Sequence, residues 1–296
     1  MSTKSKVFTG FGLYIGLMIV VVAIFGFERI DDSPFKPENE FKLDPWIDLG
    51  FMSINKAVLY IIIAGVLTVG TMVWIAKRMQ AKPNRIQTVV ELIYTSMRDN
   101  VAGANMDRRM ATKWFPFIAT LFLFIWYSNL IGYVPLPTNS EHMVNVWGFE
   151  FPAFALYAAT ANLSVPLVLA ILVFVFYTAE GIRVKGVGGY LKGLVPPGVH
   201  GPMAAFIWVL EVMSNFMRLI SLSVRLFANI LAGHLIILFM SGGLAVLLGL
   251  EVVGVIALPA GIVLYLFEIG LIATLQAFIF ATLTAIYLGG AVSESH

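Results

Sequence analysis

Hydrophobic residues run along this chain in long uninterrupted stretches, and the polar residues gather in the segments between them. Residues 7–27 and 57–76 each supply about the 20 apolar positions that a helix needs to cross the hydrocarbon of a bilayer. Residues 114–134 and 151–179 predict two further crossings, the second kinked by Pro166. The pattern therefore predicts an all-α polytopic membrane protein.

Two longer apolar blocks, residues 203–240 and 252–290, close the chain. As unbroken helices they would be about 57 and 58 Å long, roughly twice the thickness of the hydrocarbon. Each block must break, project from the membrane, or tilt by roughly 60°, far beyond the usual average of about 20°. A strong tilt would require a partner surface, so we expect a final pair of long, strongly tilted helices.

The segments between the crossings are polar. Residues 28–50 are acidic and contain three prolines, which predicts an irregular extracytoplasmic segment, and residues 135–150 also return to water. Residues 180–202 are basic and rich in Gly and Pro, which predicts a flexible cytoplasmic turn. Residues 85–109 are mixed, with apolar residues at helical spacing, and predict an amphipathic helix on the membrane surface: Ile86, Val89, Val90, Ile93, Met97 and Val101.

The basic residues predict the orientation. Thirteen of the 19 Lys and Arg residues fall on one side of the membrane, including eight in residues 77–113, and only four fall on the other side. Both termini are therefore expected in the cytoplasm, with six crossings. We favour residues 7–27 as a retained helix over a cleaved secretory signal, because no cleavage site follows it. The predicted parts are residues 1–54 (membrane helix and acidic segment), 55–290 (one membrane domain) and 291–296 (cytoplasmic tail).

Composition agrees with a membrane protein and narrows its chemistry. The chain is 59% hydrophobic and 12% charged, whereas soluble domains carry about 25% charged residues. A net charge of +2 does not suggest a nucleic-acid partner, and cysteine is absent. The four histidines and the carboxylates show no metal-binding spacing, so we predict neither a metal nor a cofactor.

Two arginines lie inside the first long block. An arginine at the centre of a membrane helix costs about 2.5–3.5 kcal/mol, so something must compensate for it. At 100° per residue, six polar side chains share a strip about 80° wide on that helix: Glu211, Ser214, Arg218, Ser221, Arg225 and Asn229. Snorkelling to the headgroups is the alternative explanation, and it stays open for Arg218, whereas for Arg225 we favour a function.

A second group of polar residues is expected away from this strip. His234 lies about 180° around the helix from Arg225. Glu268 is the only charged residue between Glu251 and Glu294, and a carboxylate there needs a partner, for which His234 is the candidate. A purely structural histidine is the alternative. Gln276 lies eight residues after Glu268 and could serve the same region.

The sequences SLSVRLFANILAGHLI (221–236) and TLQAFIFATLTAIYL (274–288) resemble the signature helices of subunit a of the F-type rotary ATP synthase. The resemblance covers about residues 45–290 and is strongest over 203–290. It implies a stator subunit of the bacterial inner membrane that works with a ring of c subunits, the peripheral-stalk b subunits and the remaining ATP synthase subunits. It also implies that this chain translocates protons but makes no ATP itself.

The same resemblance assigns roles to single residues. It implies that Arg225 is the essential arginine, that Asn229 is its companion, and that Gln276 is the family's glutamine. It implies an outer half-channel at His234 and Glu268, and an inner exit path near Glu211. Secondary candidates along that path are Arg218, Ser214 and Ser221.

Two departures from the family are visible. Glu268 precedes Gln276 by eight residues instead of seven, and Gly270 or a π-bulge would be needed to restore the register. The helix at residues 7–27 is extra. The alternative function is a proton-coupled secondary transporter for an anionic solute, which would predict an internal repeat that we do not see; a structural scaffold would leave the polar strip unexplained.

Overall fold

The computed structural model describes residues 41, 43, 47–48, 53–80, 83–146, 149–196, 198–240 and 251–292. The helix expected at residues 7–27 lies outside them. The chain divides into two compact units, residues 1–42 with 232–270 and residues 43–231 with 271–296, and each unit is described by itself.

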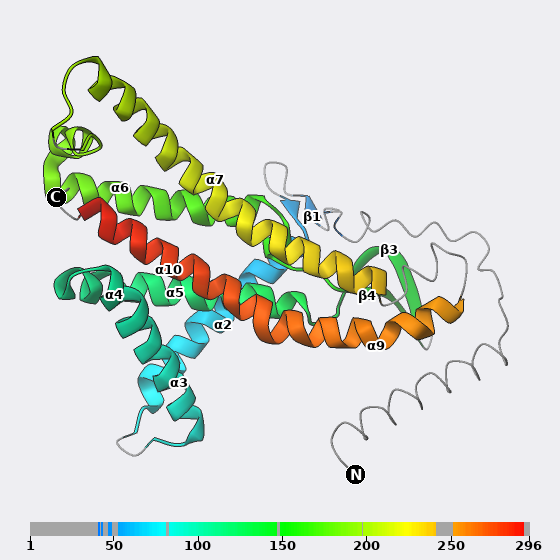
Figure 1. Cartoon of the computed structure of the whole chain (residues 1–296). Coiled ribbons are helices and arrows are strands. Elements are labelled where there is room, and N and C mark those ends of the chain that lie inside the picture. The colour runs from blue at the N-terminus through cyan, green and yellow to red at the C-terminus, as the bar shows by residue number, and fades with distance from the viewer. Residues whose placement is uncertain are drawn as a thin grey trace, which may run out of the picture. The chain divides into compact units, whose positions relative to one another are not determined.

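Helices make up nearly all of the described chain (Figure 1). Five of them are long and apolar enough to span a membrane, which confirms the predicted all-α polytopic class. These are α2 (Lys56–Arg78), α5 (Arg108–Gly132), α6 (Ser164–Lys192), α7 (Pro202–Leu238) and the run Ala257–Val292. That last run belongs to α9 (Glu251–Phe267), the π-helical segment η5 (Glu268–Ile272) and α10 (Ala273–Val292).

Side-chain caps fix where several helices begin. Asn55 accepts a hydrogen bond from the Val58 amide at 3.2 Å at the start of α2, and Asp107 accepts one from the Arg109 amide at 3.2 Å at the start of α5. These caps satisfy amides that have no partner inside the helix. Within the larger unit, α5 packs against α2 and α10, and α10 also packs against α6.

The predicted surface helix is divided in three, as α3 (Arg85–Thr95), the π-helical η2 (Ser96–Ala102) and α4 (Gly103–Asn105). Of its apolar repeat, Met97 and Val101 are buried, whereas Ile86 and Val89 are exposed. The start of α3 therefore presents apolar side chains outward, as suits a helix that contacts lipid.

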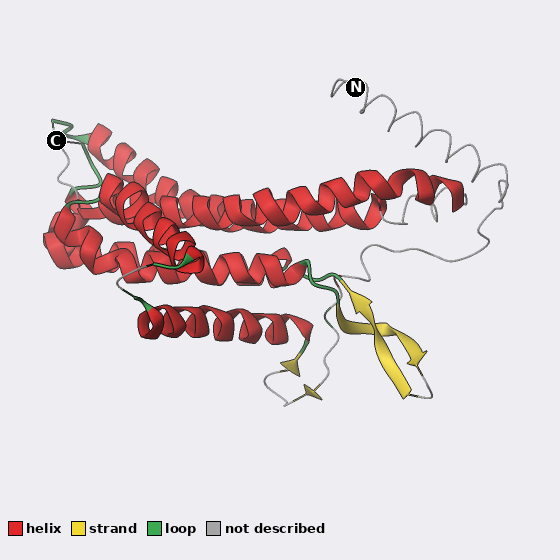
Figure 2. Ribbon diagram, turned by 90° about the horizontal axis from the view of Figure 1, so that it is seen from below, coloured by secondary structure: helices red, strands yellow, loops and turns green. Residues whose placement is uncertain are grey.

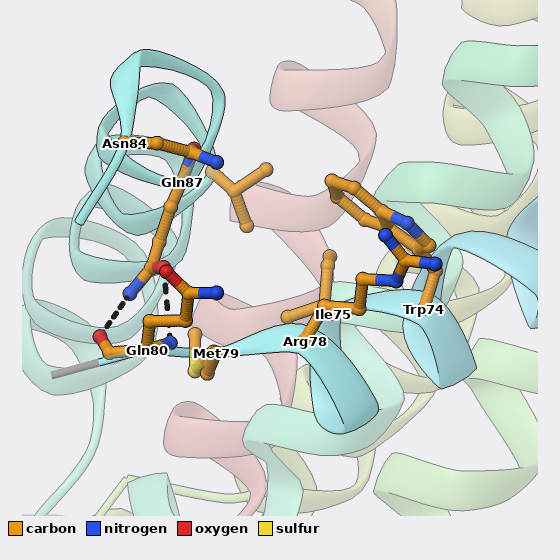
Figure 3. Close-up of a pocket in the computed structure, with 8 residues that line it drawn as sticks. Trp74, Ile75, Arg78, Met79, Gln80, Asn84 and Gln87 are labelled. Carbon is orange, nitrogen blue, oxygen red and sulfur yellow. Dashed lines mark hydrogen bonds between the residues drawn. The ribbon is translucent and has the colours of Figure 1, made fainter. Parts of the chain in front are cut away.

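The turn between α2 and α3 is closed by Gln87, which is buried (Figure 3). Its Nε2 donates to the Gln80 carbonyl at 2.9 Å and to Glu91 Oε1 at 2.7 Å, and its Oε1 accepts from the Gln80 amide at 3.1 Å. Asn84 accepts from the Gln87 amide at 2.8 Å and caps α3. These bonds fix the angle at which the surface helix leaves the membrane helix.

The predicted crossing at residues 151–179 is wrong at both ends. A hairpin of β3 (Leu136–Val146) and β4 (Phe149–Ala155) occupies its start, with Leu136 paired to Ala155 and Val146 to Phe149 (Figure 2). Prolines in both segments disfavour a helix there, because proline lacks an amide hydrogen. A short pair, β1 (Ile47–Asp48) and β2 (Ser53–Ile54), precedes α2.

The predicted kink at Pro166 is also wrong, because Pro166 is the third residue of α6, where no amide hydrogen bond is lost. The break in α6 occurs instead at Gly186, whose φ of 71° and ψ of 161° leave helical geometry. The helix then resumes to Lys192, so the first half of the glycine-rich segment predicted as a flexible turn is helical.

Candidate functional site

The polar strip lies on one unbroken helix. α7 has 37 residues without a proline inside it, and at about 1.5 Å per residue it is about 56 Å long. The six strip residues therefore share one face, as their spacing predicted: Glu211, Ser214, Arg218, Ser221, Arg225 and Asn229. The remaining question is what each of them meets there.

Arg225 lies on an open part of this face. Its side chain is exposed, as are those of Ser221 and Asn229. Leu222 and Leu226, on the neighbouring face of the helix, are buried. Among the described residues the Arg225 guanidinium has neither a hydrogen bond nor an ion pair. The compensation that an intramembrane cation requires must therefore come from outside these residues.

Gln276 comes close to this arginine from α10. Arg225 and Gln276 line one small hollow, whose walls are otherwise apolar: Leu222, Leu226, Ile279 and Phe280. Gln276 itself is buried. The structure thus brings together two of the residues that the sequence singled out from separate blocks.

Arg218 has different surroundings. It lies in a cavity of about 210 Å³ lined by residues of α6, α7, α10 and the turn after α6: Tyr177, Lys185, Tyr190, Gly193, Leu194, Glu211, Asn215, Arg218, Tyr287, Gly290 and Ala291. Its Nη2 lies 3.4 Å from Glu211 Oε1, and its Cζ lies 5.7 Å from the centre of the Tyr287 ring. Its charge is therefore balanced within the chain, by a carboxylate and the face of an aromatic ring.

Asn215 and Tyr177 belong to this cavity and were missed by the sequence analysis. Asn215 Oδ1 accepts from Arg218 Nη1 at 3.4 Å and from the Tyr177 hydroxyl at 3.5 Å, and its Nδ2 donates to the Glu211 carbonyl at 3.1 Å. Asn215 could have been found, since it lies four residues after Glu211 and three before Arg218. No pattern in the sequence indicated that Tyr177 would contribute to this cavity. Ser214 and Ser221 line neither the cavity nor the hollow.

His234 and Glu268 belong to the other compact unit. His234 is 1% exposed. A Cβ added to Gly233 would collide with the Glu268 carboxylate, so the bare backbone beside His234 makes room for that side chain. The structure therefore places the two predicted partners in one neighbourhood, and any larger residue at position 233 would require the Glu268 side chain to move.

The helix that carries Glu268 is π-helical from that residue to Ile272. A π-bulge was one of the two features that could restore the register between Glu268 and Gln276, and it is present. A π segment accommodates one more residue than the equivalent α-helical turn, which is the size of the departure seen in the sequence.

Comparison with known proteins identifies the family. The family model for the ATP synthase A chain matches residues 58–289. Relatives named ATP synthase subunit a include one from Bradyrhizobium diazoefficiens, 33% identical over 88% of this chain and 98% of the relative. Another, from Parvibaculum lavamentivorans, is 34% identical over 89% of this chain and 95% of the relative. A third, from Myxococcus xanthus, is 34% identical over 70% of this chain and 61% of the relative.

The chain belongs to the ATP synthase subunit a family. The resemblance read from the two signature helices is thereby confirmed. A member of the subunit a family is a proton-translocating part of the membrane sector of an F-type ATP synthase, works with the other subunits of that complex, and carries no nucleotide catalytic site. With five helices able to span a membrane, the chain is a multi-pass protein of the bacterial inner membrane.

Proposed function

We propose that this subunit forms the stationary side of a rotary proton path, in which Arg225 meets a carboxylate on each passing subunit of a c-ring. The observation that supports this most directly is the exposed guanidinium on α7, which has no ion pair among the described residues. A partner that approaches this face with an acidic side chain would supply the missing compensation. The 56 Å or so of α7 gives a tilted surface along which such a ring can pass.

The electrostatics explain why the proton leaves. At about 4 Å and an effective dielectric constant of about 20, a guanidinium and a carboxylate attract each other by about 4 kcal/mol. This favours the ionised carboxylate by about three pKa units, so a protonated ring carboxyl releases its proton as it nears Arg225. The same fixed charge repels protons that would pass directly between the two sides. Rotation of the ring is then the permitted route.

Two half-channels complete the path. The cavity that contains Glu211 and Arg218 is the proposed cytoplasmic exit, because it combines a carboxylate, tyrosine hydroxyls and enough volume for water. The neighbourhood of His234 and Glu268 is the proposed entry from the other side. Each elementary charge that crosses 100 mV supplies about 2.3 kcal/mol, which the ring delivers as torque.

Orientation and partners follow the charge distribution. Thirteen of the 19 basic residues fall on the side of the predicted surface helix, so both termini face the cytoplasm in this proposal. Peripheral-stalk b subunits hold the chain still while the ring turns. Asn229, one helical turn after Arg225 and equally exposed, faces the same ring surface.

The decisive experiment replaces Arg225 in the assembled complex. Arg225→Ala should abolish ATP synthesis driven by a proton gradient in membrane vesicles, and it should leave the vesicles either proton-tight or passively leaky. The matched control is Arg183→Ala, which removes an exposed arginine of α6. Synthesis at the wild-type rate in the Arg225 variant, with the complex fully assembled, would exclude the proposed role.

The entry path has its own test. His234→Ala and Glu268→Ala should each slow proton flux and shift its pH dependence, because a histidine with a neighbouring acid titrates near physiological pH. The measurement is the rate of proton pumping against pH in inverted vesicles. A pH profile that matches the wild type in both variants would count against this entry.

A further inference from the structure

The start of α10 is tied to α5 by two side chains, at the point where the π-helical segment returns to α-helix. Asn129 Nδ2 donates to the carbonyl of Ala273 at 3.2 Å, and Trp126 Nε1 donates to the hydroxyl of Thr274 at 3.0 Å. Ala273 and Thr274 are the first two residues of α10, immediately after η5 ends at Ile272. Both donors lie on α5, one turn apart.

Asn129 is held in a single orientation. Its side chain is fully buried, and its Oδ1 accepts a hydrogen bond of 2.7 Å from the hydroxyl of Thr160, which is also fully buried. Turning the amide over would bring its oxygen against the Ala273 carbonyl, so that two acceptors would face each other without a proton between them. The amide therefore acts as a fixed link between η3 (Ala159–Ala161), α5 and α10.

The position of Thr160 is itself fixed by close packing. A Cβ on Gly132 would collide with Cα and Cβ of Ala158, so the end of α5 and the segment before η3 touch with almost no side chain between them. Ala158 and Ala159 are fully buried. Close packing thus fixes the position of Thr160, and Thr160 in turn orients Asn129. Through its hydrogen bond to the Ala273 carbonyl, Asn129 then restrains the start of α10.

We propose that Asn129 is a positioning residue that fixes where the π-helical segment ends, and that it thereby sets the rotation of Gln276 beside Arg225. A π segment is a local insertion that an α-helix can absorb at several places along its length. A slip of one residue would rotate every following side chain by about 100°. Gln276 is three residues beyond Ala273, so the tether acts within one turn of it.

The functional part of this inference rests on the proposed role of Arg225, but the geometric part does not. The chain contains no cysteine. A cysteine pair at Leu222→Cys and Ile279→Cys, on the two helices that line the Arg225 hollow, therefore reports the register directly. The yield of a short bifunctional thiol cross-linker in the assembled complex measures it without any proton transport.

The variants are chosen to separate the hydrogen bond from the bulk of the side chain. Asn129→Leu keeps the bulk and removes the donor, Asn129→Ala removes both, and Thr160→Val removes the hydrogen bond that orients the amide. The matched control is Ser128→Ala, the neighbouring residue on α5, which is fully buried and whose hydroxyl has no hydrogen-bond partner among the described residues.

We expect Asn129→Leu and Asn129→Ala to lower the cross-link yield several-fold in assembled complexes. Proton-driven ATP synthesis should fall at least about tenfold, because small displacements of a reacting group cost one to two orders of magnitude. Thr160→Val should show a smaller loss of both, and Ser128→Ala should match the parent.

Two outcomes would overturn the inference. One is a wild-type cross-link yield and wild-type synthesis in Asn129→Leu and Thr160→Val. The other is failure of every Asn129 and Thr160 variant to assemble while Ser128→Ala assembles normally, which would make the network purely structural. If instead Arg225→Ala retained synthesis, the proposed function would fail while the cross-link yields still decided the role of Asn129.

Discussion

The surroundings of Arg218 and of Arg225 differ, although the two arginines lie two turns apart on the same face of α7. Arg218 has a carboxylate at 3.4 Å, an amide oxygen at 3.4 Å and a tyrosine ring beside it. Arg225 is exposed and has no such partner among the described residues. The charge of Arg218 is balanced within the described chain, whereas that of Arg225 has no counter-charge there.

Under the proposed function, this difference assigns the external interaction to Arg225. A paired guanidinium in a cavity can be replaced by water and a neutral side chain at modest cost, since both partners are more than one third exposed. If Arg225 faces a moving partner, as we propose, no side chain among the described residues can take its place. The polar strip on one helix therefore contains two kinds of site, and the neighbouring helices α6 and α10 create the distinction.

The largest expected difference is between Arg225→Gln and Arg218→Gln. Because the proposed partner of Arg225 is a passing carboxylate, Arg225→Gln should reduce proton-driven ATP synthesis by at least about 100-fold. Arg218→Gln should reduce it by no more than about fivefold. The measurement is synthesis per assembled complex in vesicles. Equal losses in both variants would remove the distinction between the two sites.

A third cation, Lys113 of α5, pairs with a carboxylate that is more deeply buried than the partner of Arg218. It forms an ion pair with Glu180 of α6, whose side chain is 7% exposed. Lys113→Met leaves that buried carboxylate without its cation. Because Lys113 itself is 39% exposed and screened by solvent, we expect a destabilisation of about 1–3 kcal/mol and a smaller amount of assembled complex. Quantitative immunoblots of washed membranes measure this.

The control for Lys113 is the double variant, Lys113→Met with Glu180→Met. Since removing both members of the pair leaves no buried carboxylate without its cation, the double variant should recover most of the assembled complex. A double variant as poorly assembled as Lys113→Met would mean that Glu180 acts beyond this pair. No internal replacement of this kind should rescue Arg225→Gln.

Glu211→Gln tests whether the carboxylate in the Arg218 cavity is as important for proton transport as Arg225. The change removes the carboxylate from the proposed exit but keeps its shape, and water in the cavity can carry protons past it. Synthesis and ATP-driven pumping should fall by no more than about fivefold, and Glu211→Asp should restore the rate. A loss as deep as that of Arg225→Gln would make Glu211 indispensable and would place both residues in one class.

The sequence was sufficient for the features that depend on one helix alone. The length of the apolar block placed α7 within two residues, and 100° per residue placed Arg225 and Arg218 on one face. The spacing of Glu268 and Gln276 is eight residues instead of the seven usual in the family that the sequence resembles. This departure pointed to Gly270 or a π-bulge, and a π-helical segment is present as η5. Such features can be predicted because they follow from the geometry of a single helix and do not depend on which elements pack against it.

Features that depend on several elements could not be predicted in this way. Residues 151–155 look like part of an apolar span, but they pair with β3 as a hairpin strand. Gly186 marked a flexible loop by composition, yet one left-handed residue lets the helix continue to Lys192. Tyr177 and Asn129 matter through contacts with other helices, and nothing in the spacing of their own helices distinguishes them.

The smallest expected effect is at Tyr157, a buried aromatic residue that packs edge to face on Tyr60 at 5.5 Å and lies under the ammonium of Lys56. Burial raises the pKa of Tyr157 to about 12, so its hydroxyl stays protonated at every pH of a transport assay. Tyr157→Phe keeps both ring contacts and should leave the rate of proton pumping within about twofold of the wild type. The pH profile should also keep its shape, in contrast to the shift expected for His234→Ala. A shifted profile would mean that Tyr157 exchanges protons with the proton path. The contact between Tyr157 and Tyr60 of α2 would then belong to that path and not only to the packed interior.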